Sequence, residues 1–144
     1  MANKPRAWRV LLTGLLLAGC AGEPGEAELR DAVGGLRTAI EQRDASAVEG
    51  ALAEDFIGPD GLDRDGARRM AAVMFLRHRE TGVRPGPLDV AMGDGYATVD
   101  FTAVVTGGAG RALPDAASIY NVSTAWRVEE GDWRLVSAEW TPGP

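Results

Sequence analysis

The spacing of apolar residues changes once along the chain, and this change limits the folds that the sequence can adopt. Between residues 26 and 80, apolar residues recur every three or four positions, which is typical of helices that bury one face. Between residues 88 and 141, they alternate with polar residues, which is typical of strands in a half-buried sheet. Helices followed by consecutive strands indicate an α+β domain, with the helices packed on a curved antiparallel sheet.

Three helices are predicted in the first part of the chain. The first has an apolar stripe that ends near residue 43 and consists of Leu29, Val33, Leu36 and Ile40. A short second helix leads into a buried strand at Phe56 and Ile57. The third helix begins at Asp63 or Asp65, either of which can cap it, and ends near residue 80.

The second part of the chain predicts four strands in two hairpins. Their turns are Asp94–Gly95 and Glu130–Gly131, and the strands are residues 88–92, 96–105, 117–128 and 132–141. The glycine-rich segment 107–115 is predicted to be a long loop between the hairpins.

The register of the second hairpin decides which side chains share the inner face of the sheet. Uninterrupted pairing places Trp126 opposite Leu135 and Val122 opposite Glu139. One end of the inner face is then polar and carries Tyr120, Ser137 and Glu139. The outer face receives a row of apolar residues, namely Ile119, Ala125, Val136, Ala138 and Trp140.

The single cysteine of the chain, Cys20, directly follows an apolar run. Residues 1–9 are basic and contain no acidic residue, and residues 10–18 are apolar apart from Thr13 and Gly14. This order is typical of an export signal, and the apolar run is too short to span a bilayer. A lone cysteine forms no internal disulfide, and no zinc-ligand spacing is present, so no metal site is predicted.

The sequence Leu17-Ala18-Gly19-Cys20 resembles the lipobox of bacterial lipoproteins at all four positions. The resemblance implies that residues 1–19 are removed and that Cys20 carries lipid on its sulfur and on its new amino group. Residues 20–26 would then be a tether and residues 27–141 the domain. Because Ala21 is not aspartate, the resemblance favours the periplasmic face of the outer membrane in a Gram-negative cell. The alternative is an ordinary signal peptide that is cleaved a few residues later.

The net charge excludes some classes of partner. The whole chain has a charge of −6, and removal of residues 1–19 takes away Lys4, Arg6 and Arg9 but no acidic residue. The mature chain therefore carries about −9, which argues against binding of nucleic acid or of anionic lipid by the chain as a whole.

The order of elements resembles the NTF2-like (SnoaL-like) superfamily over residues 27–141. The resemblance depends on three segments, "AVEGALAEDFIGPDG", "RDGARRMAAVMFLR" and "AWRVEEGDWRLVSAEW". It implies a conical pocket between the helices and the inner face of the sheet, and a homodimer formed through the outer face. Superfamily enzymes, such as ketosteroid isomerase, polyketide cyclases and an epoxide hydrolase, use Asp, Tyr, His or Arg side chains in this cone. None of their catalytic sets matches this chain residue by residue.

The predicted pocket has an apolar wall and few titratable groups. Its wall consists of Phe56, Met70, Met74, Phe101, Tyr120 and Trp126, and Glu139 is placed near the mouth. A carboxylate in an apolar pocket can act as a general acid or base, and a tyrosine can donate a hydrogen bond to an oxyanion, so Glu139, Tyr120 and His78 are the catalytic candidates. For each of the three, solvation or structural packing is the competing interpretation.

Three functions are compatible with these observations. The favoured one is a lipid-anchored envelope domain that binds a small apolar or amphipathic molecule without turnover and without a cofactor. The first alternative is a structural or protein-interaction module that uses the outer sheet face. The second alternative is an enzyme of the cyclase or isomerase type.

Overall fold

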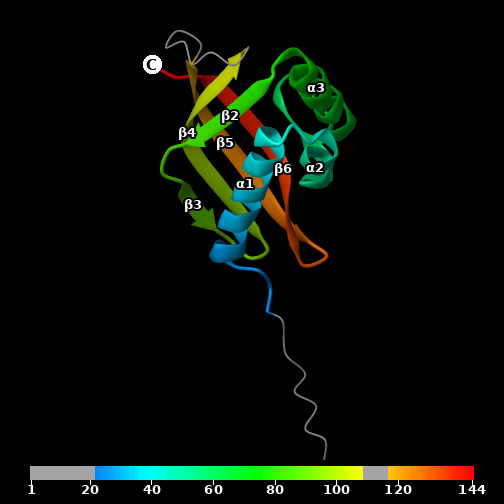
Figure 1. Ribbon diagram of the computed structural model, residues 1–144. Coiled ribbons are helices and arrows are strands. Elements are labelled where there is room, and N and C mark those ends of the chain that lie inside the picture. Colours follow the sequence, from blue (N-terminus) through cyan, green and yellow to red (C-terminus); the bar gives the residue numbers. More distant parts are fainter. Residues whose placement is uncertain (1–21, 109–116) are drawn as a thin grey trace, which may run out of the picture.

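The computed structural model describes residues 22–108 and 117–144, and it shows three helices packed on one side of a curved sheet (Figure 1). This is the predicted α+β architecture. Cys20, the lipobox and residues 109–116 of the predicted long loop lie outside the described residues. Within the described ranges, no helix is long and apolar enough to cross a membrane.

The helices largely follow the predicted apolar stripes. They are α1 (Glu26–Glu41), α2 (Ala45–Gly50) and α3 (Arg64–Arg77), with a short 3₁₀ turn, η1 (Pro59–Gly61), before α3. The carboxylate of Asp63 accepts a hydrogen bond from the amide of Gly66 at 2.7 Å and thereby caps α3. Of the two predicted caps of the third helix, the structure uses Asp63.

The sheet is mixed and has six strands. In chain order they are β1 (Leu52–Ile57), β2 (Glu80–Pro85), β3 (Asp89–Met92), β4 (Tyr96–Gly108), β5 (Ala117–Glu129) and β6 (Asp132–Pro142). The spatial order is β1-β6-β5-β4-β2, and β3 pairs with the first half of β4. All pairs are antiparallel except β1 and β6, which are parallel, so the expectation of an antiparallel sheet holds for five strands only.

Strand β2 was not predicted, because its sequence contains two helix- and strand-breaking residues and no clear alternation. It forms through pairing with the second half of β4, where Val83 lies opposite Val105. The third helix correspondingly ends at Arg77 and not near residue 80.

Both predicted hairpin turns are present. Val90 lies opposite Val99 and Met92 lies opposite Ala97, as expected for the Asp94–Gly95 turn. In the second turn, Glu130 and Gly131 have φ angles of 51° and 83°. Positive φ at both central residues defines a type I′ turn, whose twist matches that of the flanking strands.

The predicted register of the second hairpin is correct only near its turn. Trp126 lies opposite Leu135 as predicted, but a β-bulge follows, and Ala125 then lies opposite Ser137. Beyond the bulge, Val122 lies opposite Trp140 and not opposite Glu139. Because side chains alternate between faces, this shift of one residue exchanges the faces of all later residues of β6.

The main core lies between the inner face of the sheet and the helices. Trp126 is only 1% exposed, and its cluster includes Leu29 of α1, Ala67 of α3 and Leu135 of β6. The indole Nε1 of Trp126 donates a hydrogen bond to Oγ1 of Thr124 at 2.9 Å, and this hydroxyl donates to the carbonyl of Val99 at 2.7 Å. The indole donor of Trp126 is therefore satisfied inside the core.

The start of α1 is fixed to the sheet. The carbonyl of Gly25 accepts a hydrogen bond from Nε1 of Trp133 at 3.1 Å, and its amide donates to the carboxylate of Glu28 at 2.8 Å. The point at which the predicted tether meets the domain is therefore held by one strand and one helix.

Candidate functional site

The residues predicted to line a pocket occupy different environments. Phe56 and Trp126 are 3% and 1% exposed and are packed in the main core. Phe101 is partly buried against this core, and Tyr120 is half-buried on the inner face. These four side chains therefore serve mainly to pack the core, and of the four only Phe101 and Tyr120 retain exposed surface.

Met70 and Met74 lie at the edge of the inner face instead. Both are on α3, and each is 43% exposed. They flank the helix face that Ala67 and Phe75 bury, so they border the space between α3 and the sheet.

The three catalytic candidates are not brought together. The bulge in β6 places Glu139 opposite Ser123, on the outer face, where Ser123 donates a hydrogen bond to Asp100 on the next strand. Tyr120 lies on the inner face, and His78 directly follows α3. The predicted position of Glu139 on the inner face is wrong, since the bulge was not anticipated.

The same bulge moves Ala138 and Trp140 from the predicted outer face to the inner face. Ala138 is buried in the main core, in the cluster of Trp126. The predicted row of apolar residues on the outer face therefore loses two of its five members.

Trp140 instead forms one wall of a groove, which we call the mouth groove. It lies between η1, the start of α3 and the end of β6, has a volume of about 580 Å³, and is lined by Pro59, Asp60, Gly61, Leu62, Asp63, Gly66, Arg69, Met70 and Trp140. Trp140 and Met70 are 39% and 43% exposed. The groove combines apolar side chains with a charged rim.

The sequence did contain a signal for the bulge that places Trp140 on the inner face. Leu135 and Val136 are consecutive apolar residues in an otherwise alternating strand. Two apolar neighbours of this kind mark a point where the alternation changes phase, as it does at a bulge.

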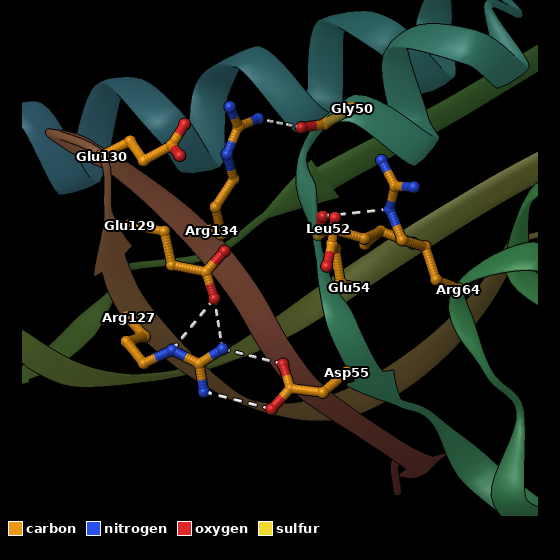
Figure 2. A pocket seen from close by; sticks show the side chains of 9 residues that line it. All are labelled: Gly50, Leu52, Glu54, Asp55, Arg64, Arg127, Glu129, Glu130 and Arg134. Atoms are coloured by element: carbon orange, nitrogen blue, oxygen red, sulfur yellow. Dashed lines mark hydrogen bonds and ion pairs between the residues drawn. The ribbon is translucent and has the colours of Figure 1, made fainter.

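A second groove lies where β1 meets β6 and the end of β5 (Figure 2). This charged groove has a volume of about 620 Å³ and is lined by Gly50, Leu52, Glu54, Asp55, Arg64, Arg127, Glu129, Glu130 and Arg134. None of these residues was predicted to belong to a site, because they are far apart in the sequence and only the parallel pairing of β1 with β6 brings them together.

Arg127 is the centre of the charged groove. Its Nη2 lies 2.8 Å from Oδ1 of Asp55, its Nη1 lies 3.3 Å from Oδ2 of the same carboxylate, and its Nε lies 3.0 Å from Oε1 of Glu129. The hydrogen bond from Arg127 holds the pKa of Asp55 below its ordinary value. The bonds to Asp55 and Glu129 raise the pKa of Arg127.

The other guanidinium groups of the charged groove bind backbone carbonyls. Arg134 donates to the carbonyl of Gly50, and Nε of Arg64 donates to that of Leu52 at 3.3 Å (Figure 2). All three arginines thus contact the edge strand β1 or the residues before it. We interpret the charged groove as a structural feature, in which the hydrogen bonds of these arginines stabilise the position of β1 at the edge of the sheet.

This interpretation predicts a pH-dependent effect of Asp55→Asn. Because folding lowers the pKa of Asp55, its stabilising contribution is complete above the ordinary aspartate pKa of about 3.9 and is lost as the pH falls through the folded-state value. We expect the variant to unfold at lower urea concentration than the wild type at pH 7, and the difference to disappear in acid.

Asp31→Asn is the matched control for this comparison. Asp31 is exposed on α1 and has no ion pair with a described residue, so its replacement should leave the midpoint unchanged. A difference between Asp55→Asn and the wild type that stays constant from pH 7 to pH 3 would contradict the ion-pair explanation.

The sequence matches no protein-family model and no curated protein. Solved structures show the fold. An NTF2-like protein from Cytophaga hutchinsonii is 17% identical, with a TM-score of 0.65, and the match covers 83% of this chain and 100% of that one. An NTF2-like protein of unknown function from Pseudomonas putida is 15% identical, with a TM-score of 0.70 and coverages of 83% and 89%.

A longer protein contains the same fold. Bd1075 of Bdellovibrio bacteriovorus is 13% identical, with a TM-score of 0.72 over 82% of this chain, and the match spans 40% of its own length. At these identities the likeness establishes an NTF2-like fold and carries no information on ligand or reaction.

Proposed function

We propose that the protein is a lipid-anchored domain of the cell envelope that binds a small apolar or amphipathic molecule in the mouth groove, without turnover. The observation that carries the binding proposal is the position of Trp140 and Met70, two large apolar side chains that face the same groove and remain partly exposed. The lipobox at Leu17–Cys20 supports the anchor, and Ala21 favours the outer membrane if the cell has one.

The composition of the mouth groove suits an amphipathic ligand. Its volume of about 580 Å³ lies in the range of small-molecule sites. Leu62, Met70 and Trp140 offer apolar contacts, and methionine adapts to ligands of varied shape. Charged side chains of both signs on the rim, Asp60, Asp63 and Arg69, can contact a polar head group.

The separation of the catalytic candidates supports binding over turnover. A general acid or base must lie within hydrogen-bond reach of the reacting group. Glu139 and Tyr120 lie on opposite faces of the sheet, so they cannot serve one substrate together.

Titration with the amphipathic dye 1-anilinonaphthalene-8-sulfonate tests the groove. We expect Met70→Glu to weaken binding about tenfold, because it removes an apolar contact worth about 1.5 kcal/mol and adds a charge of the same sign as the dye. The measurement is the dissociation constant obtained from dye fluorescence.

Met92→Glu is the matched control, since Met92 is 42% exposed and Met70 is 43% exposed, but Met92 lies on β3, away from the groove. It should bind the dye as the wild type does. Equal affinities for Met70→Glu and the wild type would reject the mouth groove as a binding site and favour the interaction-module alternative.

A further inference from the structure

We propose that the exposed face of α3 docks on an anionic lipid surface, so that the anchored domain is oriented with α3 against the bilayer. This face, the α3 face, consists of Arg69, Met70, Val73, Leu76 and Arg77. The inference rests on the proposed lipid anchor, which brings the domain to a bilayer, and adds a second contact to it.

The apolar residues of the α3 face lie on the side of the helix that points away from the core, so they do not contribute to its packing. The core face of α3 is formed by Ala67 and Phe75, which are buried. Val73 and Leu76 point away from it and are 44% and 85% exposed. A surface helix normally places polar residues at such positions, so large apolar side chains there indicate an interaction.

Positive charge accompanies these apolar side chains. The segment from residue 64 to residue 79 contains five arginines and a single acidic residue, Asp65, in a chain of net charge −6. Arg64 and Arg68 pair with Glu49 of α2 at 3.4 and 3.1 Å, and Arg69 pairs with Asp65 at 3.2 Å in an exposed position. Among the described residues, Arg77 and Arg79 form no ion pair, so the positive charge of the α3 face comes from Arg69 and Arg77. Exposed leucine and valine can bury apolar area in a membrane interface, and arginines beside them add electrostatic attraction to anionic lipid.

The length of the tether permits this orientation. Gly25, which is fixed to Trp133 and Glu28, is five positions after Cys20, so the tether spans at most about 17 Å. A domain of this length has a radius of gyration of about 13 Å. Figure 1 shows the start of α1 and helix α3 at opposite ends of the domain, so both come close to one bilayer only when the domain lies on its side, and the tether then bridges the gap between Gly25 and the lipid.

Docking through α3 would also place the mouth groove at the bilayer. Arg69 and Met70 belong to both the α3 face and the groove. A ligand of the groove would then be an amphipathic molecule that enters from the lipid surface.

The absence of any cysteine other than Cys20 makes the test direct, because lipid occupies the sulfur of Cys20 and an introduced cysteine is the sole site for a probe. Full-length lipidated protein carrying Leu76→Cys, labelled with the fluorophore NBD, is reconstituted in phosphatidylglycerol-containing or pure phosphatidylcholine vesicles. Met92→Cys, on β3, is the matched control probe. We expect a blue shift and quenching by nitroxide-labelled lipid for the Leu76 probe in anionic vesicles, and neither effect for the Met92 probe.

Charge reversal checks the role of the arginines. The double variant Arg69→Glu/Arg77→Glu should return the Leu76 probe to an aqueous spectrum while the protein still floats with the vesicles. A Leu76 probe that stays aqueous on both vesicle types, in protein that floats, would overturn the docking proposal and assign the α3 face to a protein partner. Wild-type protein that fails to float would overturn the anchor, and the docking proposal with it.

Discussion

Replacing Trp126 by alanine is expected to lower the free energy of unfolding by about 3–5 kcal/mol. The indole is 1% exposed and lies among Leu29, Ala67 and Leu135, which belong to three different elements. Its removal leaves a cavity that these neighbours cannot fill, and it leaves the hydroxyl of Thr124 without its indole donor. The measurement is the denaturant midpoint followed by far-ultraviolet circular dichroism.

Two variants separate packing from the hydrogen bond. Trp126→Phe keeps an aromatic ring but loses the bond to Thr124, so it should fall between the wild type and the alanine variant. Trp140→Ala makes the same change at a residue that is 39% exposed on the same inner face, and should cost about 1.5 kcal/mol or less. Equal midpoints for Trp126→Ala and Trp140→Ala would contradict the core position of Trp126.

The helices and hairpins were predictable from local patterns. The stripe from Leu29 to Ile40 predicted α1, and Asp94–Gly95 predicted both the turn and the register of β3 on β4. Both signals depend on residues a few positions apart, where backbone geometry restricts the outcome.

The arrangement of the site was less predictable, because it depends on pairing between distant segments. A bulge after Leu135 exchanges the faces of Glu139 and Trp140, so a predicted polar mouth becomes a groove with an aromatic wall. The parallel pairing of β1 with β6 has no local signature, and it is this pairing that brings Asp55 to Arg127.

The net charge of the chain also failed to predict the charge of its individual surfaces. A chain of charge −6 argues against anionic partners, yet the residues from 64 to 79 are strongly basic. The fold places Arg69 and Arg77 on one exposed face of α3 beside Val73 and Leu76, so the chemistry of this face differs from that of the chain as a whole.

Cys20→Ala is expected to abolish the incorporation of radiolabelled palmitate completely. The lipobox implies that a diacylglyceryl group is attached to the sulfur of Cys20 and that cleavage before this residue follows the attachment. Alanine lacks the sulfur, so neither step takes place, and the variant should accumulate as the longer precursor. Stable anchoring requires at least two lipid chains or an equivalent second signal, and this variant carries none of the chains.

The ordinary signal-peptide alternative gives the opposite result in the same experiment. A signal peptidase that cleaves a few residues after Cys20 needs no sulfur, so wild type and Cys20→Ala would be shortened equally and neither would carry palmitate. Ala21→Ser keeps the lipobox intact and is the matched control, which should be labelled and cleaved as the wild type is. Because gel mobility reports cleavage and palmitate reports lipid, the two measurements together distinguish a lipid-anchored protein from a released one.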